Sequence, residues 1–164
     1  MPKTILLVDD ERSIREALSK VLRAESYEVV LAENGEEAVT KQGERPADLM
    51  LLDLAMPAEN GWMVFHRLAE INPLLPVVII TGRSNQLALA EEAGADALME
   101  KPLDLPCLLR TIKELLDESL ETRSRHVQER ASGLRYGPCD NRLYQEMLLK
   151  RLTTPYPCPG GENK

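Results

Sequence analysis

The sequence has 164 residues, of which 43% are hydrophobic, and its formal net charge is −7. This length suits one domain of ordinary size with an appendage, and the composition suffices for a real core. No apolar run of about eighteen residues is present, which excludes a transmembrane helix, and the acidic start after a single Lys is unlike a signal peptide, so we expect a cytoplasmic protein. Three cysteines, Cys107, Cys139 and Cys158, form no recognisable disulfide framework, and we expect free thiols.

The charge is divided unevenly along the chain. Residues 1–120 contain 12 Lys and Arg against 22 Asp and Glu, whereas residues 121–164 contain 8 against 5. An acidic body disfavours nonspecific binding to nucleic acid. We therefore predict one domain over residues 1–120 and a basic, partly disordered tail over residues 121–164.

The first half of the acidic body alternates apolar runs with helical patterns. The runs at 4–8 and 28–32 are nearly continuous in apolar residues, which is typical of strands covered on both faces. Between them, apolar residues from Ile14 to Leu22 recur at helical spacing. Asn34, followed three residues later by Glu37, predicts the capped start of a second helix.

The second half of the acidic body continues the alternation. It predicts strands at 48–52, 76–80 and 97–99, and helices at 59–71, from Ser84 to Gly94, and after Asp104. Gly94 suits the end of a helix because glycine adopts the left-handed conformation without strain. Five strands alternating with five helices predict a doubly wound α/β domain with a parallel sheet.

Polar side chains follow these predicted strands at their carboxyl ends, where such sheets bind ligands. They are Asp9 and Asp10, Asp53, Thr81 and Lys101. A lone buried carboxylate costs several kcal/mol, roughly, unless it is paired or hydrated. Taken alone, Asp53 is an ordinary strand-end carboxylate and Asp10 caps the next helix. Together the five side chains predict one site in which Asp53 has charged neighbours.

The chemistry of this set favours phosphoryl transfer. Clustered carboxylates raise one another's pKa unless a cation intervenes, and oxygen-rich clusters favour Mg²⁺. A Lys and a Thr hydroxyl beside such an ion suit a transferring phosphoryl group, whose charge spreads over three oxygens. No Cys or Ser competes as a nucleophile at these strand ends, so we expect a carboxylate to attack phosphorus and form an aspartyl phosphate.

Four segments carry a family resemblance: ILLVDDE, LLDLAMPAENG, VVIITG and GADALMEKP resemble the landmarks of response-regulator receiver domains from two-component systems. The resemblance covers residues 3–120. It implies a flavodoxin-like (βα)5 fold with a five-stranded parallel sheet of order 2-1-3-4-5. It also implies that Asp53 is the phosphoacceptor. The Mg²⁺ site would consist of Asp9, Asp10, Asp53 and the backbone carbonyl of Ala55. Asp10 would be a direct ligand of the ion, and Asp9 would act mainly through metal-bound water.

The remaining expectations come from the same resemblance. Thr81, Gly82 and Lys101 would surround the phosphoryl group, and the Lys101–Pro102 bond would be cis. The phosphodonor would be a phosphohistidine on a sensor histidine kinase or phosphotransfer protein, or a small acyl phosphate. Such a response regulator is no enzyme toward other substrates and catalyses only its own phosphorylation and dephosphorylation, signalling to an unknown downstream protein as a monomer or weak dimer.

One position departs from the family pattern. Receivers commonly carry Tyr or Phe three residues before the Lys, where this chain has Leu98. An aliphatic side chain offers no ring edge or hydroxyl, so we expect Leu98 to give a weak switch, or one in which the fourth helix shifts alone.

Two other function classes are alternatives for this sequence. The first is a DNA-binding transcriptional regulator that acts through the basic tail, although we consider nucleic acid an unlikely partner. The second is a haloacid-dehalogenase-type enzyme, which we reject because that chemistry needs an Asp two residues after the nucleophile, where Ala55 stands.

Within the tail, we interpret 121–130 as a solvated helix extension or linker, 131–140 as loop, 141–152 as a possible short amphipathic helix, and 153–164 as disordered.

Overall fold

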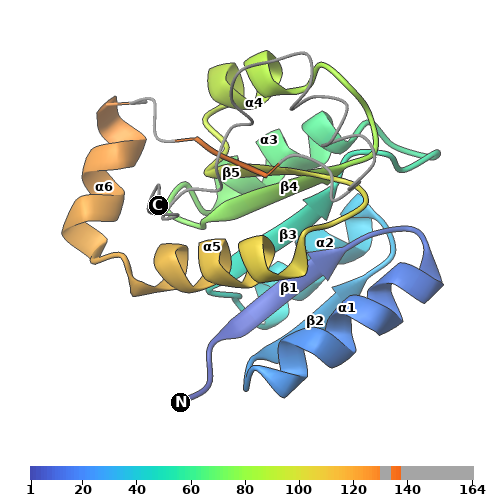
Figure 1. The fold of residues 1–164 in the computed structure, drawn as a ribbon. Coiled ribbons are helices and arrows are strands. Elements are labelled where there is room, and N and C mark those ends of the chain that lie inside the picture. Colours follow the sequence, from blue (N-terminus) through green and yellow to red (C-terminus); the bar gives the residue numbers. More distant parts are fainter. Residues whose placement is uncertain (130–133, 138–164) are drawn as a thin grey trace, which may run out of the picture.

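A computed structural model of the chain describes residues 1–129 and 134–137. Its centre is a parallel sheet of order β2-β1-β3-β4-β5-β6 (Figure 1). The strands are β1 (Thr4–Val8), β2 (Glu28–Ala32), β3 (Leu49–Asp53), β4 (Val77–Thr81), β5 (Ala97–Glu100) and β6 (Arg135–Gly137). The predicted five-strand order 2-1-3-4-5 is confirmed, and β6 extends it by one strand beyond β5.

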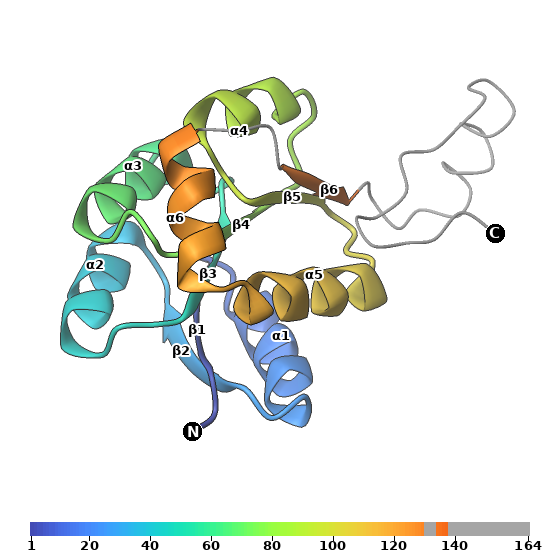
Figure 2. The same cartoon turned by 90° about the vertical axis from the view of Figure 1, so that its left-hand side faces the viewer.

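Helices cover both faces of this sheet (Figures 1 and 2). They are α1 (Arg12–Ala24), α2 (Gly35–Glu44), α3 (Gly61–Ile71), α4 (Leu87–Ala93), α5 (Leu105–Asp117) and α6 (Leu120–Glu129). Side chains of α1 and α5 pack in one buried apolar cluster, and those of α2, α3 and α4 pack in another. Strands β1, β3, β4 and β5 are buried between the two clusters, which explains their unbroken apolar runs, whereas most of β2 is half-buried.

Local sequence signals set several helix ends. The Asn34 side chain accepts a hydrogen bond from Glu37 N at the start of α2, as predicted, and Asp104 accepts one from Cys107 N at the start of α5. Gly94 ends α4 with φ of 80°, in the left-handed region that favours glycine. The N-cap of α1 is Glu11 instead of the expected Asp10, because the chain leaves β1 through a turn before the helix begins.

The tail contributes more structure than its composition indicates. Residues 135–137, interpreted as loop, form β6. Residues 120–129, within the segment interpreted as a solvated helix extension or linker, form the separate helix α6, in which Arg123 is the one buried side chain among those described. Cys107 is disulfide-bonded, so the expectation of free thiols is wrong for this residue. The possible helix at 141–152 and the segment 153–164 lie outside the described residues. Among the described helices, none is long and apolar enough to span a bilayer.

Candidate functional site

Asp53 is the last residue of β3, at the carboxyl end of the sheet. It is 3% exposed, so its charge needs partners inside the protein. One carboxylate oxygen, Oδ1, accepts a hydrogen bond from Ala55 N at 2.9 Å, and Oδ2 lies 3.1 Å from Lys101 Nζ. The anomalous carboxylate within LLDLA is therefore compensated by one backbone N–H and one ammonium group.

Asp9 and Asp10 follow β1 and complete an acidic cluster with Asp53. Carboxylate oxygens of the three residues all lie within 4.8 Å of one another. Asp9 is buried, and its Oδ1 accepts a hydrogen bond from Glu11 N at 2.8 Å, whereas Asp10 is exposed. Burial raises the pKa of the Asp9 carboxyl, and the neighbouring charge of Asp53 raises it further, against the opposing effects of the Glu11 N–H and Lys101.

Lys101 is the cation that faces this cluster. Its Nζ lies 3.2 Å from Asp9 Oδ2 and 3.1 Å from Asp53 Oδ2. Burial alone would lower the pKa of Lys101, but hydrogen bonds and charge from the two carboxylates outweigh burial and raise it. The backbone of Lys101 is joined to β4, since Lys101 N donates to Thr81 O at 2.8 Å. The Lys101–Pro102 bond is cis, as expected.

Thr81 and Gly82 form the adjoining wall, at the end of β4. Thr81 is fully buried, and its Oγ1 accepts a hydrogen bond from Arg83 N at 2.9 Å. A Cβ added to Gly82 would meet no atom within 4 Å. The space beside this backbone is therefore open, and a larger side chain at this position would meet no steric obstacle.

The backbone around Ala55 is shaped by residues that the sequence interpretation missed. A Cβ added to Gly61 would lie 2.6 Å from Leu54 Cα, so the start of α3 sits directly on the chain that leads to Ala55. Glu59 Oε2 accepts a hydrogen bond from Gly35 N at 2.6 Å and ties this loop to α2. The glycine at position 61 was a visible signal in the sequence, whereas the partner of Glu59 depends on a contact 24 residues away.

Leu98 lies inside the protein and not on its surface. It is 1% exposed, belongs to the cluster shared with α2, α3 and α4, and pairs in register with Ile79 of β4. Any movement of Leu98 therefore requires repacking of a close-packed core.

The donor set fits a hard divalent cation. Among the described residues, the acidic cluster at the ends of β1 and β3 offers only oxygen ligands. Mg²⁺ favours oxygen ligands, takes one or two carboxylates and retains water. Three carboxylates against one ammonium group leave excess negative charge, which such an ion would neutralise.

Comparisons with known proteins agree with this geometry. The model of the response regulator receiver domain family matches residues 5–113. The response regulator MprA of Mycobacterium sp. (strain KMS) is 36% identical over 118 residues, covering 71% of this chain and 51% of MprA. The chain thus spans about half the length of this curated relative.

Two solved structures resemble the fold closely. A CheY-like receiver domain protein from Methanospirillum hungatei JF-1 superposes with a TM-score of 0.69 at 30% identity, covering 76% of this chain and 99% of that protein. The response regulator TrrA of Thermotoga maritima, solved in complex with Mg²⁺ and BeF, superposes with a TM-score of 0.64 at 36% identity, covering 69% of this chain and 98% of TrrA.

Proposed function

This chain belongs to the response regulator receiver domain family of two-component systems, and from that membership we propose that Asp53 accepts a phosphoryl group and that the resulting change of shape signals to a protein partner. The donor is a phosphohistidine on a sensor histidine kinase or phosphotransfer protein. The observation that carries the proposal is the buried Asp53 carboxylate, 3.1 Å from Lys101 Nζ and within 4.8 Å of the Asp9 and Asp10 carboxylates.

In this proposal the protein positions the reactants and supplies charge. An Asp53 oxygen forms the bond to phosphorus while the bond from phosphorus to the donor nitrogen breaks. Asp9, Asp10, Asp53 and the backbone carbonyl of Ala55 would hold Mg²⁺, which would supply positive charge for the phosphoryl oxygens. Lys101 Nζ already contacts the Asp53 carboxylate, and after the transfer it pairs with the phosphoryl oxygens. Such electrostatic preorganisation is usually the largest single contribution to catalysis.

Thr81 links the phosphoryl group to the rest of the molecule. Its Oγ1 now accepts a hydrogen bond from Arg83 N, and its hydroxyl proton is available to a phosphoryl oxygen. A shift of Thr81 would therefore break or move its hydrogen bond with Arg83 N, and so displace the loop that leads to α4. That loop ends at Gln86, whose Oε1 accepts a hydrogen bond from Trp62 Nε1 at 3.1 Å. The proposed signal reaches α3 and α4 through this connection.

Two tail arginines bear on the DNA-binding alternative. The guanidinium of Arg123 is buried against Asp96, and that of Arg135 lies between Glu114 and Glu118. Both positive charges are thus engaged by carboxylates of the acidic body and are not available to a phosphate backbone. This removes two of the eight positive charges of residues 121–164 from contact with nucleic acid.

The test is phosphorylation by a small acyl phosphate, followed as the mass increase of one phosphoryl group in the intact protein. We expect wild-type protein to be labelled only with Mg²⁺ present, and Asp53→Asn to remain unlabelled. Asp117→Asn is the matched control, because Asp117 is an exposed carboxylate on α5. Full labelling of the Asp53 variant would refute the assignment of this residue.

A further inference from the structure

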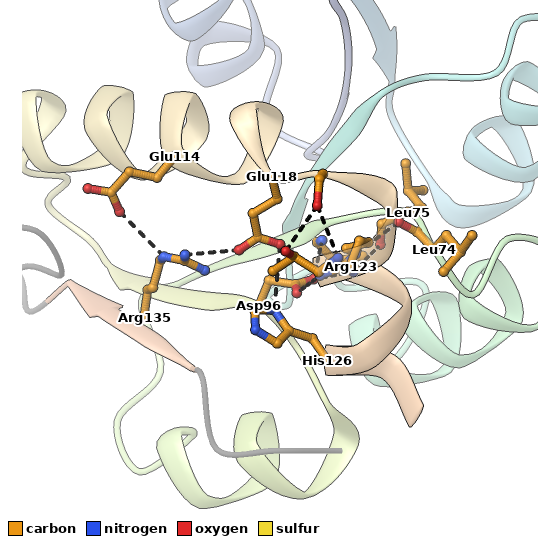
Figure 3. Close-up of polar contacts among 11 residues, drawn as sticks. Leu74, Leu75, Asp96, Glu114, Glu118, Arg123, His126 and Arg135 are labelled. Atoms are coloured by element: carbon orange, nitrogen blue, oxygen red, sulfur yellow. Dashed lines mark hydrogen bonds and ion pairs between the residues drawn. The ribbon is translucent and has the colours of Figure 1, made fainter. Parts of the chain in front are cut away.

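The strap, defined as the described part of residues 119–137, follows α5 in the chain. It consists of Ser119, α6 and residues 134–137, which include β6 (Figure 2). Helix α6 crosses the end of the sheet where β4 and β5 begin, opposite the acidic cluster. Arg123, at 6% exposure, anchors it: Nε donates to Leu74 O at 3.0 Å, and an η nitrogen donates to Leu75 O at 3.1 Å (Figure 3).

The same guanidinium forms a two-point ion pair with Asp96, with one of the N–O distances at 2.9 Å. Asp96 immediately precedes β5, and its Oδ2 also accepts a hydrogen bond from Val77 N of β4 at 2.8 Å. Planar two-point pairing with full hydrogen bonding is the geometry in which a buried Arg is stable. Arg123 therefore joins α6 to the starts of both strands.

A second arginine fastens the other end of the strap to α5. The Arg135 side chain lies 3.4 Å from Glu114 and 3.0 Å from Glu118, and Arg135 N donates to Asp96 O at 2.9 Å (Figure 3). His126 of α6 lies 3.6 Å from the second oxygen of Glu118. Carboxylates of α5 and the edge of β5 thus form one surface that accepts an extended segment carrying an Arg.

Strand β6 fills that surface. It pairs with β5 in parallel register, with Ala97 opposite Arg135 and Met99 opposite Gly137. An unpaired strand edge is a ready template for another extended segment. In this structure the occupant is residues 134–137 of the chain itself.

β5 lies directly between the strap and the phosphoacceptor site. Its other edge pairs with β4, where Glu100 is opposite Thr81, and Lys101 follows it immediately. In the structure with the strap closed, Lys101 Nζ pairs with the Asp53 carboxylate and Thr81 Oγ1 accepts a hydrogen bond from Arg83 N. This is the arrangement before phosphoryl transfer. We propose that the strap is an autoinhibitory contact: by pairing residues 134–137 with the edge of β5, it covers a strand-docking surface and holds β5 and Lys101 in the unphosphorylated position.

This inference rests on the proposed function and has a thermodynamic consequence. If strap closure favours the unphosphorylated arrangement, then by linkage a phosphoryl group favours strap opening to the same degree. Loosening the strap must therefore tighten the binding of a phosphoryl mimic to Asp53. Beryllofluoride with Mg²⁺ is the probe.

The experiment compares Arg123→Ala and Arg135→Ala with the matched control Arg125→Ala, an exposed arginine on the same helix. Lys101 N faces β4, and N–H directions alternate along a strand, so Met99 N also faces β4 while Leu98 N faces β6. We expect Leu98 amide exchange to accelerate about tenfold or more in the two strap variants while Met99 is unchanged. We also expect the beryllofluoride Kd to fall about fivefold or more.

The control variant and the two strap variants together test the inference. Arg125→Ala should change neither measurement. Should Arg123→Ala fail to fold, Arg135→Ala decides alone, because it leaves the buried pair with Asp96 intact. Unchanged Leu98 exchange, or faster exchange with an unchanged Kd, overturns the inference. Wild-type protein that binds no beryllofluoride overturns the proposed function itself, which separates the two failures.

Discussion

Two charge clusters lie at opposite ends of the same sheet, and they differ in the balance of positive and negative charge. At the carboxyl ends of the strands, Asp9, Asp10 and Asp53 face one cation, Lys101. At the amino ends, Arg123 faces Asp96, and backbone carbonyls take its remaining donors.

The difference in charge balance distinguishes a ligand-binding site from a structural ion pair. The acidic cluster carries excess negative charge and one exposed carboxylate, so it can gain stability by binding a cation from solution. The Arg123–Asp96 pair is neutral as a unit and its polar atoms already have partners. We therefore expect the first cluster to bind ligands directly, and the second to respond to them only through opening of the strap.

The largest effect should come from breaking the balanced pair. Arg123→Ala leaves Asp96, whose side chain is 12% exposed, without its partner; loss of one member of a buried ion pair typically costs about 3–5 kcal/mol of unfolding free energy. Arg125→Ala, at an exposed position, should stay within about 0.5 kcal/mol of wild type. Urea denaturation of the three proteins gives both values, and a small loss for Arg123→Ala would show that the pair is not well packed.

The second prediction concerns the domain boundary. We keep the proposal that residues 1–120 fold alone, because all five βα units lie there. A fragment of residues 1–137 adds Arg123 and β6, so we expect it to melt at a higher temperature than fragment 1–120. Calorimetry should show a single cooperative transition in each. A molten shorter fragment would contradict the proposed boundary, and equal midpoints would contradict a stabilising strap.

A smaller loss is expected at the unbalanced cluster. Lys101→Ala removes the ammonium group that faces Asp9 and Asp53, and losing a buried hydrogen-bonding partner costs about 1–3 kcal/mol. The variant should keep its fold, but phosphorylation-dependent output should be impaired. The control is Lys113→Ala, whose ion pair with Asp117 is exposed and worth about 0–1 kcal/mol. Loss of far-ultraviolet circular dichroism in the Lys101 variant would mark it as structural.

Magnesium should stabilise the acidic cluster and leave the neutral pair unaffected. At ten times its Kd, Mg²⁺ should add about 1.4 kcal/mol to the free energy of unfolding, and removal by a chelator should reverse this. Asp53→Asn should lose most of the gain, whereas Asp117→Asn should keep it. Equal gains in both variants would place the ion elsewhere.

The stabilisation by Mg²⁺ should depend on pH, and the sign of that dependence follows from the pKa of Asp9. Burial and then the charge of Asp53 raise the pKa of Asp9 above its ordinary value. A raised carboxyl pKa favours the folded state below the ordinary pKa, and this contribution is lost as the pH rises through the folded-state pKa. Protons thus compete with Mg²⁺ at Asp9, so the stabilisation by Mg²⁺ should shrink as the pH is lowered toward that raised pKa.

The smallest expected effect is at Leu98. Because its side chain is aliphatic and close-packed, we expect phosphorylation to bias the surface by about 1 kcal/mol less than an aromatic switch would. Amide chemical shifts on α4 and α5, with and without beryllofluoride and Mg²⁺, measure the response. A hundredfold gain in partner affinity with an inward swing of Leu98 would contradict this expectation.

Several features were determined by the sequence alone, because their causes are local. Continuous apolar runs predict strands buried on both faces, and Asn34, Asp104 and Gly94 act within one helical turn of their own positions. The identity of Asp53 and Thr81 as strand-end residues follows from the same runs. In a parallel sheet all carboxyl ends meet at one edge, so these residues had to converge.

The role of the tail was decided only by tertiary structure. The segment around Arg123 is polar and has the composition of a solvated helix, and nothing within a few residues indicates that Arg123 is buried. Its burial depends on Asp96, 27 residues earlier, and on carbonyls of Leu74 and Leu75 further back in the chain. Strand β6 likewise has only three residues and exists because the edge of β5 offers it hydrogen-bonding partners. Such long-range pairing has no signature in local composition, whereas hydrophobic periodicity and capping do.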